Sequence, residues 1–92
     1  MNDLHEIPTD RELAGMTPGQ FKAYENKLRR MAERQLLILV KSRARDPYAL
    51  GYRTYGLLDK RTGEFRFHAL PDGYGLEIGH IHRILTRREG ML

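Results

Sequence analysis

A capped helix that leads almost directly into a β-rich run is the feature that most constrains the fold of this chain. The segment "TPGQ" predicts the helix start, because Thr17 suits the N-cap, Pro18 the first helical position and Gln20 a capping box. One face of the helix is apolar, since hydrophobic side chains recur at steps of three and four: Phe21, Tyr24, Leu28 and Met31, with Ala32 beside them. Glu25 and Arg29 can pair across one turn. "LLILVKS" follows at once and predicts a strand with both faces at least partly covered.

The second half of the chain predicts two more strands and a closing helix. "YRTYGLLD" has a strand pattern, and the turn "DKRTGE" offers Gly63 for a positive φ. "EFRFHAL" predicts a half-buried strand that alternates Phe65, Phe67 and Ala69 against Arg66, His68 and Leu70. After the turn "PDGYG", "LEIGHIHRILTRRE" predicts an amphipathic helix with Gly79 at its N-cap and an apolar face made by Ile78, Ile81, Ile84 and Leu85.

The expected architecture is therefore α+β, in the order α-β-β-β-α, with a three-stranded antiparallel sheet covered by two helices. Double-stranded-RNA-binding domains have this kind of layout, and so do small RNA-cleaving toxins of the mRNA-interferase class. The C-terminal "GHIHRILTRREG" is similar to the closing helix of those toxins. Residues 17–92 are predicted to form this single domain. They follow an acidic leader, residues 1–16, that is mobile or loosely docked and in which "TDRELA" predicts about one helical turn.

Composition excludes several classes of protein. With 40% apolar and 30% charged residues the chain is an ordinary folding sequence, and the absence of cysteine excludes disulfides and thiolate metal sites. The longest apolar run, residues 36–40, is far shorter than a membrane span, and the acidic N-terminus lacks the pattern of a secretion signal. We therefore expect a cytoplasmic protein that does not engage a membrane.

Charge is distributed unevenly along the chain. Residues 1–20 hold one basic and four acidic residues (−3), residues 21–66 hold twelve and five (+7), and residues 67–92 hold three of each. A basic middle segment behind an acidic leader favours a polyanionic partner for the middle segment. The alternative is that the leader folds back and neutralises part of that surface.

Basic residues and tyrosines concentrate in "KSRARDPYALGYRTYG", residues 41–56, which holds four positive charges and three tyrosines. Asp46 and Pro47 predict a break in regular structure there, and Ser42 or Asp46 is expected to fix the loop through local backbone hydrogen bonds. The candidate binding residues belong to this loop and to the exposed stripe of the first helix: Lys27, Arg30, Arg34, Lys41, Arg43, Arg45, Tyr48, Tyr52 and Arg53.

Three interpretations of this surface stay open. Basic groups contact the phosphates of nucleic acid, while tyrosines stack on unpaired bases. Tyrosine and arginine are also enriched in the hot spots of protein–protein interfaces. In the third interpretation the arginines only serve solubility, and Tyr52 or Tyr55 belongs to the core. A separate alternative for Arg45 is that it locks the turn beside Asp46 instead of meeting a partner.

The sequence indicates no catalytic, metal or cofactor site. An RNA-cleaving toxin would need a catalytic histidine on the second strand, which has none, and His68 beside Arg66 is the only substitute. On a helix His80 and His82 point about 200° apart, so they cannot share a metal. The glycines of "DGYGLEIG" lack the lysine that a phosphate-binding loop requires. We therefore expect a non-enzymatic protein without cofactors.

Two stretches, "FKAYENKLRRMAERQ" and "LVKSRARDPYALGYRTYGLLD", resemble a set of short, uncharacterised proteins of actinobacteria and their phages. Those proteins carry "YENRLRRMA-RQG", "L-KSRRRDP-A-GYGTYGLVD" and a closing "GYGL" helix, so the resemblance runs from Met16 to about Leu85. It implies an actinobacterial or phage origin, a cytoplasmic setting and a non-enzymatic role. The pattern has glycine where this chain has Leu36 and Arg53.

Nucleic-acid binding through the basic, tyrosine-containing loop and helix face is the leading hypothesis. The alternative, favoured by a phage origin, is a protein that binds and inactivates a host protein. A ribonuclease-like toxin that uses His68 is the third hypothesis.

Overall fold

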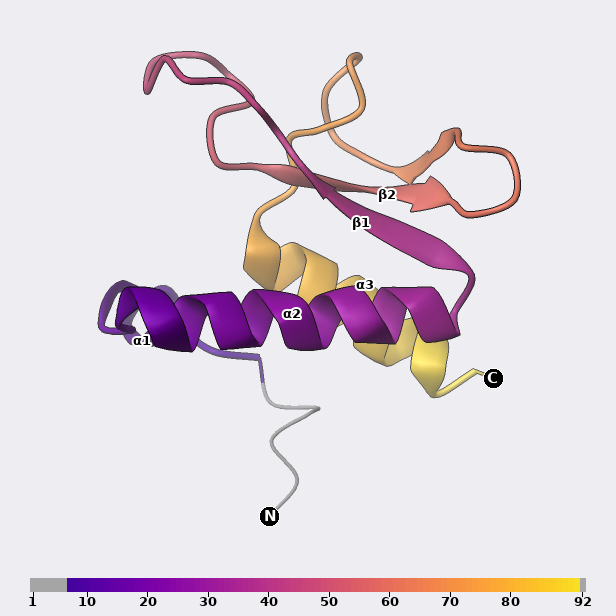
Figure 1. Ribbon diagram of the computed structural model, residues 1–92, viewed down its shortest axis with the longest axis horizontal. Helices are drawn as coiled ribbons and strands as arrows, with labels where there is room; N and C mark the ends of the chain where they lie inside the picture. Colours follow the sequence, from indigo (N-terminus) through magenta and orange to yellow (C-terminus); the bar gives the residue numbers. More distant parts are fainter. Residues whose placement is uncertain (1–6, 92) are drawn as a thin grey trace.

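The computed structural model describes residues 7–91 and has the predicted α+β fold (Figure 1). A three-stranded antiparallel sheet of order β1-β2-β3 lies on two helices, and a short helix precedes them. The elements are α1 (Asp10–Ala14), α2 (Pro18–Arg34), β1 (Leu37–Lys41), β2 (Tyr55–Asp59), β3 (Phe65–Phe67) and α3 (Ile78–Glu89). No helix within residues 7–91 is long and apolar enough to cross a lipid bilayer.

Helix α2 begins as its sequence predicts. Thr17 Oγ1 accepts a hydrogen bond from the Gln20 N–H (3.1 Å), and Gln20 Oε1 accepts one from the Thr17 N–H (2.9 Å), which completes the capping box. The helix ends where Leu36 takes a φ of 61° and turns the chain directly into β1. Its predicted apolar face lies in the core, where Tyr24, Leu28, Met31 and Ala32 are buried.

The predicted leader is described in part, and its residues 1–6 lie outside the described range. Residues 10–14 form the expected short helix, α1, which Thr9 caps through its side chain. This helix lies beside the start of α2 (Figure 1), and Leu13 and Met16 pack against the core. The described part of the leader therefore rests on the domain.

The core lies between the inner face of the sheet and the two long helices. Leu39 of β1 stands opposite Leu57 of β2, and Lys41 stands opposite Tyr55, so alternate residues of both strands point inward. The most deeply buried large hydrophobic side chains are Leu37, Leu39, Tyr55 and Leu57 of the sheet and Leu28, Met31, Ile81 and Leu85 of the helices.

Strand β3 departs from the predicted alternation. Phe67 pairs with Leu57 and packs against the core, whereas Phe65 pairs with the next residue of β2 and covers Gly56 on the outer face. Arg66 is therefore an extra residue, a β-bulge, which places the two phenylalanines on opposite faces. The prediction that Phe65 and Phe67 share one face is wrong. Side chains alternate strictly between the two faces only where no bulge interrupts the pairing of the strands.

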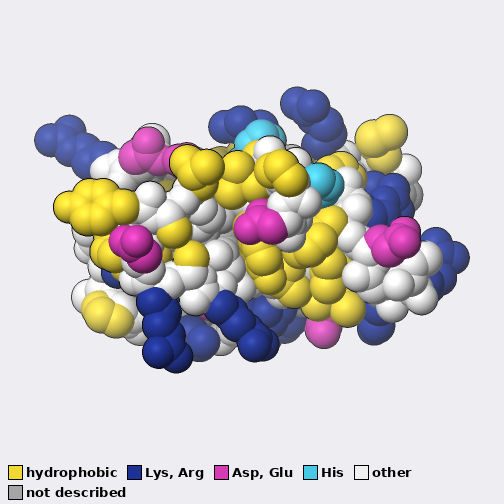
Figure 2. Space-filling model, turned by 90° about the horizontal axis from the view of Figure 1, so that it is seen from above, with side chains coloured by type: hydrophobic (Ala, Val, Ile, Leu, Met, Phe, Trp, Pro, Cys, Tyr) yellow, Lys and Arg dark blue, Asp and Glu magenta, His cyan; other side chains and the backbone are white. Residues whose placement is uncertain are grey.

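The outer face of the sheet carries an apolar patch (Figure 2). Ile38 is 36% exposed, and Val40, Leu58 and Phe65 are half-buried. Figure 2 looks onto this face and shows lysine and arginine side chains around the margins of the hydrophobic area. This side of β1 is less covered than its apolar run predicts, because both long helices lie on the other face.

The closing helix α3 is present, but it starts earlier than predicted. Glu77, not Gly79, is the N-cap, since Ile78 is already helical, and Glu77 makes no side-chain capping bond. His80 is exposed, whereas His82 is buried, with its Nδ1 in a 2.8 Å hydrogen bond to the Tyr24 hydroxyl. The two histidines therefore point apart, as their spacing on a helix predicts. Burial raises the pKa of Tyr24 to about 12.

Candidate nucleic-acid interface

The predicted binding loop, residues 42–54, connects β1 to β2 and projects beyond one end of the sheet (Figure 1). Ser42 Oγ and Asp46 Oδ1 each accept a hydrogen bond from the backbone two residues later, at 3.2 and 2.9 Å, as predicted. Thr54 Oγ1 donates to the Gly51 carbonyl (2.7 Å) and accepts from the Gly75 N–H (2.9 Å). The loop is therefore held both from within and by the segment that leads into α3.

The tip of the loop presents large side chains to solvent. Tyr48 is 94% exposed and Leu50 is 87% exposed, so neither contributes to the core. Arg43 and Arg45 are exposed and form no ion pair within residues 7–91. Asp46 caps the backbone and makes no ion pair with Arg45 within residues 7–91, so this contact does not lock Arg45 as a structural residue.

Arg53 has an unusual backbone conformation, with a φ of 58°. The left-handed region costs a residue with a side chain about 1–2 kcal/mol. Its guanidinium carbon lies 5.2 Å from the ring centroid of the half-buried Tyr52, a cation–π contact that offsets about 0.5–1 kcal/mol at an exposed site. The turn at Arg53 also delays the start of β2 to Tyr55, later than the sequence pattern predicts.

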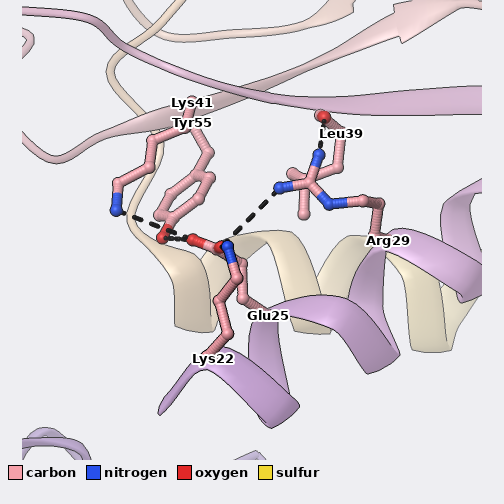
Figure 3. A network of polar contacts seen from close by, with 6 residues as sticks. All are labelled: Lys22, Glu25, Arg29, Leu39, Lys41 and Tyr55. Atoms are coloured by element: carbon pink, nitrogen blue, oxygen red, sulfur yellow. Dashed lines mark hydrogen bonds and ion pairs between the residues drawn. The ribbon is translucent and has the colours of Figure 1, made fainter. Parts of the chain in front are cut away.

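Below the loop, the carboxylate of Glu25 joins the ends of β1 and β2 to α2 (Figure 3). The Glu25 side chain is only 5% exposed, and the buried Tyr55 hydroxyl donates to its Oε2 at 2.6 Å. The side-chain nitrogens of Lys41, Arg29 and Lys22 lie 3.7, 3.6 and 3.9 Å from its oxygens. The predicted pair of Glu25 with Arg29 is present, as one part of this larger network.

The protonation states of this network are fixed by its surroundings. Burial raises the pKa of Glu25, but the hydrogen bond from Tyr55 and the three nearby cations together hold that pKa below its usual value. Burial and the adjacent carboxylate raise the pKa of Tyr55, so its hydroxyl stays protonated and donates. The pair is therefore suited to holding structure rather than to exchanging protons near neutral pH.

A groove of about 550 Å³ opens at this network, between the first two helices and the base of the loop. Glu25 and Tyr55 line it together with three cationic side chains, those of Lys22, Lys41 and Arg53. Since three cationic side chains and one carboxylate line it, the groove is net positive and suits an anion. Arg29 also donates to the Leu39 carbonyl (2.8 Å) on the edge strand, which hinders edge-to-edge pairing with another sheet.

The stripe of α2 that the sequence assigns to the same surface lies elsewhere. Arg34 pairs with Glu89 of α3 at 3.0 Å, and Lys27 lines a different groove that His82 of α3 also lines. Arg30 lies within about 60° of both residues around the helix axis, so it belongs to the same flank. The structure therefore does not bring the helix stripe and the loop into one surface, because β1 and the loop base pass along the opposite flank of α2.

Glu25 and His82 are buried, which the sequence did not predict. Glu25 is four residues after Phe21 and three before Leu28, and His82 has a similar place between Ile78 and Leu85. Their positions could have indicated this burial, because both residues lie three or four positions from hydrophobic residues of the same helix. A residue inside the apolar stripe of a helix faces the core whatever its side chain.

His68 does not occupy the predicted strand, because β3 ends at Phe67. Its side chain is exposed, and its Nδ1 lies 2.8 Å from the Leu70 carbonyl oxygen, which gives the ring a local structural contact. In the part of the chain that the structure describes, no three acidic or histidine side chains are grouped to hold a metal ion.

Comparison of the chain with family models, with curated proteins and with solved structures gives no match. The geometry of the loop and its base is therefore the ground for a functional assignment.

Proposed function

We propose that the protein binds nucleic acid without catalysis, through the loop of residues 42–54, and that it prefers unpaired strands. Tyr48 carries this proposal: its side chain is 94% exposed in the same loop as Arg43 and Arg45, which have no acidic partner within residues 7–91. An exposed ring in the same loop as unpaired guanidinium groups suits base stacking together with phosphate contact. Lys41 and Arg53 continue the positive charge into the groove at the loop base.

Two backbone positions support the resemblance to the actinobacterial and phage proteins, and we propose that the chain is a cytoplasmic member of that family. Leu36 and Arg53 are the non-glycine residues with positive φ within residues 7–91, and they stand where the pattern has glycine. Arg53 has a backbone conformation that glycine would adopt without strain, so the arginine costs stability. It also adds a positive charge beside Tyr52. Such strain is common at binding sites, where a side chain is retained for its contacts.

Fluorescence anisotropy with a labelled single strand of about 20 nucleotides tests the proposal at several salt concentrations. Replacing Arg43 and Arg45 by alanine should weaken binding and reduce the slope of log K against log salt by about 1.4, or 0.7 for each lost phosphate contact. The matched control, Lys27→Ala with Arg30→Ala, removes the same charge from the other flank of α2 and should leave the slope nearly unchanged. Both variants should keep the melting temperature of the wild type.

Tyr48 provides a separate test of stacking. Tyr48→Ala should weaken binding by about 1–3 kcal/mol, whereas Tyr48→Phe keeps the ring and should bind nearly as the wild type does. Equal effects of the loop and helix pairs would show that overall charge, not the loop, governs binding. An absence of binding at low salt would refute the proposed binding of nucleic acid. A large fall in the melting temperature of the Arg43→Ala with Arg45→Ala variant would show that these arginines stabilise the fold.

A protein partner is the second candidate, because apolar side chains are also exposed. Leu50 is 87% exposed beside Tyr48, and the outer face of the sheet carries the patch around Ile38 (Figure 2). This candidate fits a phage protein that inactivates a host protein. A pull-down from an actinobacterial lysate separates the two, because one dominant protein retained through nuclease and moderate salt, and lost with Leu50→Asp, favours the protein partner.

A further inference from the structure

A second concentration of positive charge lies between β3 and α3, outside the residues that the sequence indicated. Two adjoining hollows of about 250 and 200 Å³ are both lined by Phe67, His80 and Ile84. Within the described chain no carboxylate lines either hollow, and the titratable side chains that do are Arg66, His68, His80, Arg83, Arg87 and Arg88. We call the two hollows together the β3–α3 groove.

Two of its cations are held in place around one aromatic ring. The guanidinium carbons of Arg66 and Arg88 lie 5.8 and 5.5 Å from the ring centroid of Phe67. Arg88 also donates from Nε to Gln35 Oε1 at 3.1 Å, and Arg66 lies 3.6 Å from Asp59, which does not line the groove. Their positions are thus set before any ligand arrives, which lowers the ordering cost of binding.

Two further arginines have no structural role that the contacts reveal. Arg83 and Arg87 stand one turn apart on α3, are exposed, and form no side-chain hydrogen bond or ion pair within residues 7–91. The helix dipole favours cations in the last turn, which accounts for Arg87 and Arg88. It does not account for Arg83, one turn earlier, or for Arg66 on another element. The convergence of these groups therefore points to an anionic ligand.

We propose that the β3–α3 groove is a second phosphate-binding site for nucleic acid, separate from the loop. A guanidinium group can bind a phosphate through two parallel hydrogen bonds to its oxygens. No carboxylate of the described residues lines the groove, so no negative side chain there repels a phosphate. The loop and the C-terminal end of α3 lie toward opposite ends of a molecule that is 38 Å long (Figure 1). One strand that spans the molecule reaches both sites. This inference rests on the proposed function for the identity of its ligand.

The test uses the same labelled single strand and four proteins: wild type, the loop pair Arg43→Ala with Arg45→Ala, the groove pair Arg83→Ala with Arg87→Ala, and all four substitutions combined. The groove pair should reduce the salt slope by about 1.4, and the combined variant by about twice that amount. Replacing both groove arginines by lysine keeps the charge and should restore most of the slope. The control, Lys60→Ala with Arg61→Ala in the exposed β2–β3 turn, should have no effect on it.

The outcomes separate this site from the loop. A groove pair that behaves like the control in the turn overturns the second site, whatever the loop pair does. A groove pair that lowers the slope while the loop pair does not would support the groove and refute the loop as the proposed interface. A melting temperature that falls by no more than a few degrees, as the loss of Arg87 from the last turn of α3 allows, confirms that the exposed groove residues act on binding and not on folding.

Discussion

Removal of one buried hydroxyl tests whether Glu25 holds the base of the loop. Tyr55→Phe deletes the group that donates to Glu25 Oε2 at 2.6 Å and leaves the buried ring in place. A hydrogen bond to a charged group contributes about 1.5–3 kcal/mol to stability. The three cations near the carboxylate are 40–69% exposed, so water screens their ion pairs and they do not replace the bond. We therefore expect the free energy of unfolding to fall by about 1.5–3 kcal/mol.

Glu25→Gln separates the charge of this bond from its geometry. The amide oxygen still accepts from the Tyr55 hydroxyl, but a hydrogen bond between neutral groups contributes only about 0.5–1.5 kcal/mol. In the Glu25→Gln background, Tyr55→Phe should therefore cost about half as much as in the wild type. The difference between the two backgrounds, about 1 kcal/mol, measures the charge-dependent part of the interaction.

Urea unfolding of the four proteins of this cycle, followed by circular dichroism, measures these free energies. In a domain of this size each kcal/mol shifts the melting temperature by about 4–8 °C, so thermal unfolding checks the result. Equal costs of Tyr55→Phe in the two backgrounds would refute the reasoning. So would a cost below about 0.5 kcal/mol in the wild type, because an exposed or alternatively bonded hydroxyl would then be implied.

The same carboxylate predicts how stability depends on pH. The folded-state pKa of Glu25 lies below its usual value of 4.5, so its contribution to stability is complete above that value and is lost as pH falls through the folded-state pKa. Glu25→Gln lacks this titration. The stability advantage of the wild type over Glu25→Gln should therefore be constant near neutral pH and shrink in acid. A difference that persists in acid, measured by urea unfolding at a series of pH values, would contradict the assignment.

Three further substitutions test other features of the fold. Arg53→Gly and Arg53→Ala remove the same charge, but only glycine relieves the φ of 58°, so thermal unfolding should show the glycine variant to be more stable by about 1 kcal/mol. The buried Thr86 hydroxyl oxygen has no hydrogen-bond partner within residues 7–91, so Thr86→Val should raise stability to urea by about 1 kcal/mol. Gly56→Ala would place a Cβ against the backbone carbonyl oxygen of Gly73 and 2.6 Å from a Phe65 ring carbon, and urea unfolding should show a loss of about 1–3 kcal/mol. Equal glycine and alanine variants, a destabilised valine variant or an unaffected Gly56→Ala would each contradict its argument.

Features decided by neighbouring residues could be predicted from the sequence. The capping box of Thr17 and Gln20 and the turn bonds of Ser42 and Asp46 join groups only a few positions apart, so local chemistry determines them. The order of the elements could be predicted as well. A helix with one apolar face and three short strands can bury their apolar surface only by packing in layers.

Features decided by distant contacts could not be predicted in the same way. Phe65 faces outward because a bulge shifts the pairing of β3 with β2, and no period within β3 reveals that shift. Glu25 is stable in the core because it meets Tyr55, thirty residues later in the chain. Whether the stripe of Lys27 joins the loop depends on the flank of α2 along which β1 passes, which the helical pattern alone leaves open.

The network at Glu25 links the core of the domain to the proposed interface. Lys41 and Tyr55 stand opposite each other at the ends of β1 and β2, and both contact the Glu25 carboxylate. These two residues stand on either side of the loop of residues 42–54, so the two ends of the loop are held together before any ligand binds. The exposed ring of Tyr48 and the loop arginines then lose less freedom on binding, which leaves more of the contact free energy for affinity. Glu25 shares its one negative charge among Lys22, Arg29 and Lys41, whereas Arg43 and Arg45 have no acidic partner within residues 7–91. The loop arginines are therefore the freest to contact phosphate, and Glu25 contributes by holding the two ends of the loop.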